Sequence, residues 1–177
     1  MKDEQETESE IEKKYLLWED GEDFSTEAME EIYEKIENEE RMEVKQGYLS
    51  EELGKELAEE LELNPDFEPV EYRLREECGE KKFTLKGEGQ LNRAEMETEL
   101  EGKYFEEYWP ETSGSRVFKE TAYIPYQGFE AEIEFYQDKD LIVVEVEVPT
   151  EEEAEELEPL GKDVTGDPSY KNKNIAD

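Results

Sequence analysis

Residues 10–17 read EIEKKYLL. Successive side chains of a β-strand point to opposite faces, so a strand here places Glu10, Glu12 and Lys14 together on one face. The other face then carries Ile11, Lys13, Tyr15 and Leu17. A face with two carboxylates and an ammonium group in a row is either solvated or part of a functional site. The remaining strands decide between these two interpretations.

Seven further segments are predicted to be strands, and most of them alternate charged and apolar residues in the same way. They are residues 42–50, 70–77, 81–88, 92–100, 115–124, 129–137 and 141–148. Eight strands so close in sequence are expected to pair mostly antiparallel. The sequence therefore predicts an α+β, mainly β fold built on an eight-stranded antiparallel β-barrel.

Acidic amphipathic helices are predicted around these strands. Ser25 or Thr26 is expected to N-cap a helix that runs to about Glu40. Further helices are predicted at residues 50–63, 104–109 and 150–158, with a last helical turn in the C-terminal tail. The first nine residues, MKDEQETES, are predicted to be a flexible acidic leader, so residues 10–177 form a single domain.

The charge of the chain excludes several functions. Lys and Arg number 20 against 55 Asp and Glu, which gives a net charge of −35 and argues against nucleic-acid binding. The chain has no histidine and one cysteine, so histidine catalysis and an internal disulfide are excluded. No signal peptide or membrane-spanning run is visible, which predicts a cytoplasmic protein. We hypothesise that the excess of acid keeps the protein soluble at high salt concentration.

The basic residues are distributed unevenly in this acidic chain. If the charged strand faces were solvated, we would expect mostly acids on them. Instead, six of the few basic residues fall on these faces, and these are Lys14, Arg73, Arg75, Lys86, Arg93 and Lys119. This enrichment indicates that the charged faces form a site and that the apolar faces pack beneath the helices.

A charged barrel interior needs a ligand of matching chemistry. Divalent cations prefer carboxylate oxygens and keep neighbouring acids ionised. Clustered Arg and Lys side chains match an anion with many oxygens, and phosphate pairs with the guanidinium group through two hydrogen bonds. Acids for a metal and bases for phosphates together predict a metal-bound phosphate chain.

These residues resemble the triphosphate tunnel metalloenzymes, also called the CYTH superfamily, whose first strand reads E-x-E-x-K. Glu10, Glu12 and Lys14 match this pattern, although Glu99, Glu101 and Lys103 match it too and are interpreted as an accidental copy. The more specific similarity is an ordered series of short matches over residues 10–176. The series consists of QGYLS at 46–50, RLR at 73–75, FTLKG at 83–87, R-x-E-x-E at 93–97, the strand around Glu134, VEVEVP at 144–149 and VTGDPSYKN at 164–172.

The resemblance implies an antiparallel barrel whose tunnel binds a triphosphate with one or two Mg²⁺ or Mn²⁺ ions. It implies carboxylates on the metal side, which are Glu10, Glu12, Glu145, Glu147, Glu95 and Glu97. It implies cations that hold phosphates, which are Lys14, Arg73, Arg75, Lys86, Arg93, Lys119 and, in a terminal segment that closes one end, Lys171. Lys14 and Glu134 would act in catalysis, with Glu134 as the base that activates water.

The implied function is metal-dependent hydrolysis of inorganic tripolyphosphate or of nucleoside triphosphates by a monomer or homodimer, without nucleic-acid or membrane partners. The alternatives are a class IV adenylate cyclase, a thiamine triphosphatase and a non-catalytic polyphosphate- or nucleotide-binding module. An acidic structural protein without a ligand is a further alternative. One departure from the family is Thr121, where K-x-R-Y in other members places an arginine, and this departure predicts one phosphate contact fewer.

Overall fold

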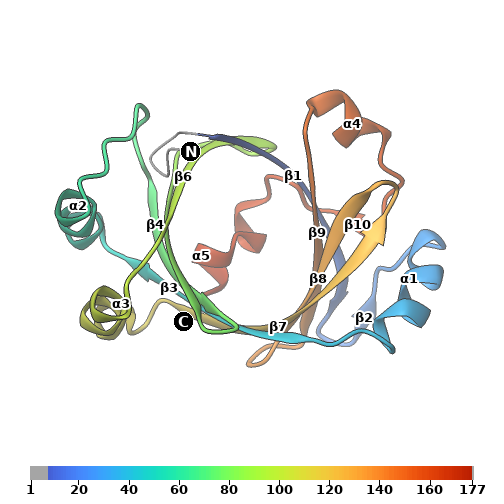
Figure 1. Cartoon of the computed structure of the whole chain (residues 1–177). Helices are drawn as coiled ribbons and strands as arrows, with labels where there is room; N and C mark the ends of the chain where they lie inside the picture. Colours follow the sequence, from blue (N-terminus) through green and yellow to red (C-terminus); the bar gives the residue numbers. More distant parts are fainter. Residues whose placement is uncertain (1–7, 177) are drawn as a thin grey trace.

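The computed structural model describes residues 8–176 and shows a closed β-barrel (Figure 1). Its strands neighbour one another in the order β1-β6-β5-β4-β3-β7-β8-β9, and β9 pairs with β1 again. The strands are β1 Glu8–Glu19, β3 Met42–Leu49, β4 Glu71–Glu77, β5 Glu80–Lys86, β6 Asn92–Glu99, β7 Arg116–Tyr126, β8 Phe129–Tyr136 and β9 Leu141–Val148. All these pairs are antiparallel, which confirms the predicted eight-stranded antiparallel barrel.

Strand β1 closes the barrel because it is long enough to pair on both edges. Its first residues, Glu8–Ile11, pair with β6, and the stretch from Ile11 to Glu19 pairs with β9. A bulge lies between Leu16 and Trp18. The short strand β10 (Lys162–Asp163) pairs with β1 before the bulge, at Tyr15 and Leu16, and β2 (Glu22–Asp23) pairs beyond it. Full closure leaves none of the barrel strands with an open edge, so the inward faces enclose a tunnel.

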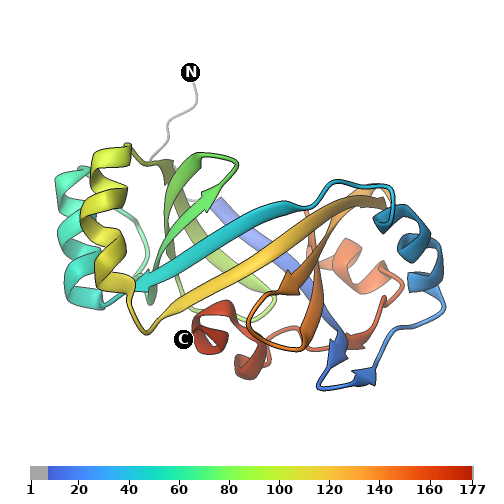
Figure 2. The ribbon, with the colours of Figure 1, turned by 90° about the horizontal axis from the view of Figure 1, so that it is seen from below.

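Helices cover the outside of the barrel on two opposite sides (Figures 1 and 2). Helices α2 (Glu51–Glu60) and α3 (Gly102–Tyr108) lie on one side, and α1 (Ala28–Ile36) and α4 (Glu151–Glu156) lie on the other. Two apolar clusters fill the space beneath them, one around Leu57, Phe83 and Phe105 and the other around Ile32 and Val144. The apolar strand faces thus pack under the helices, as predicted.

The C-terminal segment lies across one end of the barrel, where α5 (Asn172–Ile175) follows the 3₁₀ turn Pro168–Tyr170 (Figures 1 and 2). Ile175 joins a third apolar cluster with Leu16, Tyr136 and Val143. By the alternation along β1 and β9, Leu16 and Val143 share the inward faces with Lys14 and Glu145. The sequence did not predict this cluster, because it assigned every inward position to the charged face.

The start of α1 differs from the prediction. Glu27 occupies the N-cap position without a side-chain cap hydrogen bond, and the helix ends at Ile36 instead of near Glu40. The Thr26 hydroxyl donates instead to the Pro159 carbonyl oxygen at 2.5 Å, and Ser25 shares a hydrogen bond with Tyr33. The prediction was wrong because both hydroxyl groups are used in other contacts, which local sequence does not specify.

The predicted leader falls largely outside the described residues, which begin at residue 8, and its last two residues belong to β1. A further 3₁₀ turn, Trp109–Thr112, continues α3 beyond the position of Pro110, where the sequence predicted its end. Among residues 8–176, no helix is both long and apolar enough to cross a membrane.

Candidate active site

Two cavities that share lining residues lie inside the barrel, with volumes of about 60 Å³ and about 140 Å³. The smaller, here called the closed-end cavity, is lined by the C-terminal segment around Lys171, together with Lys14 and Arg93. The larger, here called the acidic cavity, is lined by Arg75, Lys119, Glu95, Glu97, Glu132, Glu134 and Glu147 among others. Both cavities share Glu10, Glu12, Arg73, Lys86 and Glu145, so every residue predicted for the site lines at least one of them.

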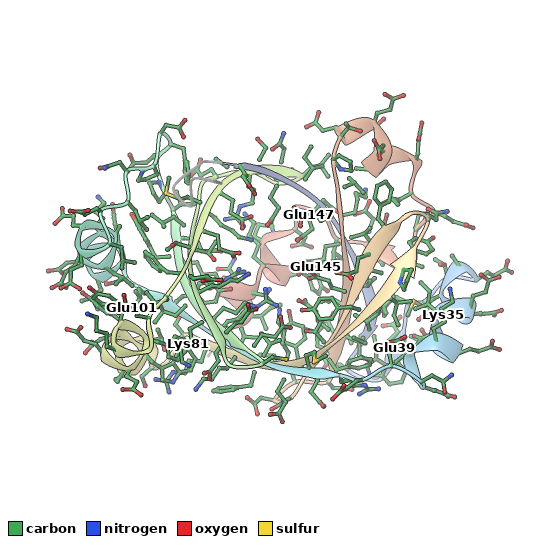
Figure 3. The ribbon with its side chains drawn as sticks, in the orientation of Figure 1. Lys35, Glu39, Lys81, Glu101, Glu145 and Glu147 are labelled. Atoms are coloured by element: carbon green, nitrogen blue, oxygen red, sulfur yellow. The ribbon has the colours of Figure 1, made fainter. Side chains whose placement is uncertain are left out.

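Strand register brings the predicted residues together from distant parts of the chain. Lys14 lies opposite Glu145 and Glu12 opposite Glu147 in the β1–β9 pair, and Glu10 lies opposite Arg93 in the β1–β6 pair. Figure 3 shows Glu145 and Glu147 on β9 at the interior of the barrel. The charged alternation of each strand therefore converges on one tunnel.

Lys14 connects β1 to the acidic residues and to the C-terminal segment. Its Nζ lies 3.1 Å from Glu145 Oε1 and donates to the Tyr170 carbonyl oxygen at 2.9 Å. Burial alone would lower the pKa of Lys14, but the carboxylates of Glu145, Glu12 and Glu134 raise it above its usual value. Lys14 therefore stays charged inside the tunnel.

Glu10 and Lys86 form a second buried ion pair. Lys86 Nζ lies 3.1 Å from Glu10 Oε1. Burial would raise the pKa of Glu10, but the Lys86 ammonium group and a hydrogen bond from Glu95 lower it to about 2. Burial, and next the neighbouring carboxyl group of Glu10, raise the pKa of Glu95 to about 8. Two adjacent carboxyl groups thus differ in protonation at neutral pH when no cation is bound.

The arginines of β4 retain unused hydrogen-bonding groups. Arg73 lies 3.6 Å from Glu97 and is 8% exposed, while its Nε has no hydrogen-bond partner among the described residues. The Nε of Arg75 is also buried and lacks a partner among them. Arg93, in contrast, lies 3.5 Å from Glu71 and donates to the Gly87 carbonyl oxygen. Buried donors without acceptors are costly, so these two guanidinium groups are suited to a bound anion.

Three carboxylates form a cluster in the acidic cavity. One oxygen from each of Glu132, Glu134 and Glu145 lies within 4.8 Å of the others. Glu134 is 1% exposed and its Oε2 has no hydrogen-bond partner among the described residues, although its Oε1 accepts from Lys119 Nζ at 2.5 Å. Burial and Glu145 raise the pKa of Glu134, and burial with the same neighbour raises that of Glu132 to about 8. Carboxylates held this close without a cation are destabilised, so this donor set fits a divalent metal ion.

The two cavities differ in charge balance. The closed-end cavity is lined by five acids and five cations, so its lining has no net charge. The acidic cavity is lined by eight acidic and four basic residues, an excess of four acidic groups. The balance of acidic and basic groups therefore differs between the two cavities.

The C-terminal segment is fixed over the closed-end cavity. Lys171 Nζ donates to the Gly89 carbonyl oxygen at 3.5 Å, and Tyr170 donates to Glu19 at 2.8 Å. Tyr136 donates to the side-chain oxygen of Asn172, a residue that lines both cavities. Lys171 is thus located in the closing segment, where the resemblance placed it.

Sequence reasoning missed several residues that line the tunnel, namely Glu71, Glu132, Gln46, Tyr48 and Asn172. The alternation of β4 and β8 could have indicated Glu71 and Glu132, since each precedes a selected residue by two positions. Gln46 and Tyr48 lie on the face of β3 opposite to its charged residues. The family matches QGYLS and VTGDPSYKN contain Gln46, Tyr48 and Asn172 but assign them no role. Thr121 lies opposite Glu134 on β7 and is fully buried, with no partner for its hydroxyl among the described residues.

Comparisons with known proteins agree with this architecture. The chain is 39% identical over 121 residues to an inorganic triphosphatase of Nitrosomonas europaea, a match covering 64% of this chain and 80% of that protein. Its fold matches the crystal structure of the inorganic triphosphatase NE1496 with a TM-score of 0.55 and 29% identity, over 94% of this chain and 93% of that one. A candidate adenylate cyclase from Bacillus halodurans matches with the same TM-score at 15% identity, over 84% and 85% of the two chains, and shows the fold alone. No family model matches the chain.

The closed eight-stranded barrel with a charged tunnel defines the structural class, and the 39% identity gives the relationship within it. The chain belongs to the triphosphate tunnel metalloenzyme, or CYTH-like, superfamily, in its inorganic triphosphatase branch.

Proposed function

We propose that this protein hydrolyses inorganic tripolyphosphate with the help of a divalent metal ion. The observation that carries the proposal is the set of buried atoms without hydrogen-bond partners among residues 8–176. Donors at Arg73 Nε and Arg75 Nε share one tunnel with an acceptor at Glu134 Oε2. Unused donors favour an anion and an unused carboxylate oxygen favours a cation, so a metal–phosphate complex complements both.

The cations of the tunnel would bind and orient the phosphate chain. Arg73 and Lys86 line both cavities, Lys14, Arg93 and Lys171 line the closed-end cavity, and Arg75 and Lys119 line the acidic cavity. Charge in phosphoryl transfer is spread over the equatorial phosphoryl oxygens, and preorganised cations stabilise it without reorganisation. Cations distributed over both cavities match an anion with several phosphate groups.

The carboxylates of the acidic cavity would hold the metal. Glu132, Glu134 and Glu145 form the cluster, and Glu10, Glu12, Glu95, Glu97 and Glu147 line the same cavity. When bound, a Mg²⁺ or Mn²⁺ ion would neutralise phosphate charge and lower the pKa of a bound water. The oxygen-only donor set is suited to such hard cations.

Glu134 is the carboxylate that we propose to accept the proton of the attacking water. Its Oε2 has no hydrogen-bond partner among the described residues and is available to accept a proton, and Lys119, at 2.5 Å from Oε1, holds the carboxyl group in place. Lys14, paired with Glu145 at 3.1 Å, would contribute positive charge beside the phosphates.

The lining of the acidic cavity favours an unsubstituted phosphate chain. Every residue that lines the acidic cavity is polar or charged, and none of these side chains offers an apolar surface for a purine or thiazolium ring. The closed-end cavity is only about 60 Å³ and lies beneath the C-terminal segment. We therefore expect tripolyphosphate to be preferred over nucleoside triphosphates. A cytoplasmic location and a monomeric or homodimeric state stay predictions.

The test is phosphate release from tripolyphosphate, ATP and thiamine triphosphate, with Mg²⁺ or Mn²⁺ and at high salt. The double variant E145Q/E147Q removes two tunnel carboxylates, and E101Q is the matched control because Glu101 is exposed outside the tunnel. We expect fast release from tripolyphosphate by the wild type and E101Q and none by the double variant. No release from any of the three compounds by the wild type would contradict the proposal.

A further inference from the structure

Tyr48 is a buried phenol in the tunnel that the charged residues do not explain. It lies on β3, is 4% exposed and lines the closed-end cavity. In the β3–β4 pair it lies opposite Arg73, whose guanidinium group lines the same cavity. Its ring belongs to the apolar cluster under α5, so the phenol joins that cluster to the polar tunnel.

The hydrogen bond from Gln46 makes the Tyr48 hydroxyl oxygen an acceptor and leaves its proton available for donation. Gln46 lies two residues earlier on the same strand face, is 1% exposed, and donates from Nε2 to Tyr48 Oη at 3.1 Å. A phenolic oxygen that accepts in this way still has its own proton to donate. Among the described residues, no acceptor lies within hydrogen-bonding geometry of that proton.

Other phenols at the tunnel ends differ from Tyr48 in this respect. Tyr136 donates to Asn172, Tyr170 donates to Glu19 and Tyr123 donates to Glu77. Their hydroxyl groups serve as structural connections. Tyr48 combines burial, a position on the cavity and an unused proton, and an unused buried donor is costly without a ligand.

The surroundings keep this proton in place. Burial raises the pKa of Tyr48 far above its usual value, and Glu71 adds to the rise. The hydroxyl therefore remains a neutral donor at any working pH. Lys14, Arg73 and Arg93 line the same cavity, so an anion held by these cations would lie beside the hydroxyl.

We propose that Tyr48 donates a hydrogen bond to a phosphate oxygen of the bound triphosphate and that Gln46 positions its hydroxyl for this contact. The proposal rests on the proposed function and adds an uncharged phosphate-binding residue to it. A neutral donor adds affinity for a phosphate oxygen and, unlike a further cation, leaves the charge balance of the cavity unchanged. Tyr48 is therefore a binding residue and Gln46 a positioning residue.

The experiment compares Y48F with the matched control Y123F, which also removes one phenolic hydroxyl but from a group that already has an acceptor. Binding of the imido-bridged analogue of tripolyphosphate, with Mg²⁺, is measured by calorimetry, beside KM and kcat for tripolyphosphate and the melting temperature. Because a hydrogen bond to a charged acceptor is lost, we expect Y48F to raise Kd about 10-fold to 100-fold. Its kcat should change little. Y48F leaves Gln46 Nε2 without its acceptor, so we expect a modest fall in the metal-free melting temperature, no larger than that of Y123F, and Y123F should bind as the wild type does.

A third variant, Q46M, tests the positioning role. Methionine keeps the length of glutamine but cannot donate, so the Tyr48 hydroxyl is free to rotate, and we expect a smaller rise in Kd. If the wild type neither binds the analogue nor hydrolyses tripolyphosphate, the proposed function fails. If the wild type does both and Y48F binds as tightly as Y123F, only the inference about Tyr48 fails. A metal-free melting temperature that falls much further in Y48F than in Y123F, together with the loss of affinity, would also overturn it, since that result indicates a structural role.

Discussion

Two stretches of this chain carry the same E-x-E-x-K pattern, but the fold places one inside the tunnel and the other at the surface. Glu10, Glu12 and Lys14 line the tunnel. Glu101 and Lys103 lie at the start of α3, where their side chains are 74% and 68% exposed. Figure 3 shows Glu145 in the interior of the barrel and Glu101 outside it, beside α3. The spacing of charged residues alone therefore does not determine whether a stretch lines the tunnel.

The difference comes from what each stretch pairs with. Strand β1 is hydrogen-bonded along both edges, so its inward face is enclosed and its charges meet partners from other strands. The second copy straddles the end of β6, and only Glu99 belongs to that strand. Glu101 and Lys103 pair with each other at 3.6 Å in solvent. Such an exposed pair contributes little to stability.

The largest expected effect is on the rate of tripolyphosphate hydrolysis, and it compares the two copies of the pattern directly. E12Q removes a tunnel carboxylate, whereas E101Q removes the equivalent residue of the exposed copy. We expect E12Q to lower tripolyphosphate hydrolysis about 100-fold or more, because a weaker metal site loses several kcal/mol of transition-state stabilisation. E101Q should keep wild-type activity. Burial and neighbouring acids raise the pKa of Glu12, so E12Q should melt no lower than the wild type without metal. Equal activity of the two variants would contradict the prediction.

The second effect is on stability. K14M leaves Glu145, which is 8% exposed, without its partner at 3.1 Å, and an unpaired buried charge typically costs about 3–5 kcal/mol. K103M removes a solvated charge, and we expect a change within about 0.5 kcal/mol. Urea unfolding of the metal-free variants measures both. A K14M protein as stable as K103M would show that the ion pair in the tunnel has no structural role.

The third effect is the pH dependence of the metal-free protein. The pKa values of Glu95 and Glu132 are raised to about 8, so the folded state binds more protons than the unfolded state between about pH 4.5 and pH 8. Stability should therefore fall as pH rises through this range. Glu10 and Glu145 have lowered pKa values, so their contribution is lost instead as the pH falls below about 4.5.

Melting curves from pH 4.5 to pH 9 in EDTA test this expectation. E95Q/E132Q should flatten the decline between pH 5 and pH 8, and E101Q should leave it unchanged. Saturating Mg²⁺ should also reduce it, because a bound cation keeps the carboxylates ionised. A wild-type melting temperature that rises with pH in EDTA would contradict the assigned pKa shifts.

The smallest expected effect is the salt dependence of the melting temperature, which distinguishes charges at the surface from charges in the tunnel. With a net charge of −35, repulsion among exposed acids should weaken the fold at low ionic strength. We expect the melting temperature to rise from low to molar KCl, and to rise by a similar amount in E12Q, because buried charges are screened less. A flat melting temperature in the wild type would reject the hypothesis of adaptation to high salt.

The sequence by itself determined the strands, the barrel and most of the tunnel. Alternation with a period of two is a local property, so it assigned Glu10, Arg73 and Glu145 to inward faces before any partner was known. Helix ends were less predictable, because Ser25 and Thr26 use their hydroxyl groups in other contacts instead of capping α1.

Only the tertiary structure decided which charges meet. Register across the barrel joined Lys119 to Glu134 and brought Glu132 into the acidic cluster, and neither pairing is encoded within one strand. It also gave Tyr48 a free hydroxyl proton and placed Asn172 of the tail beside Tyr136. Pairing depends on closure of the whole sheet, so identical local patterns at 10–14 and 99–103 could be separated only by the fold.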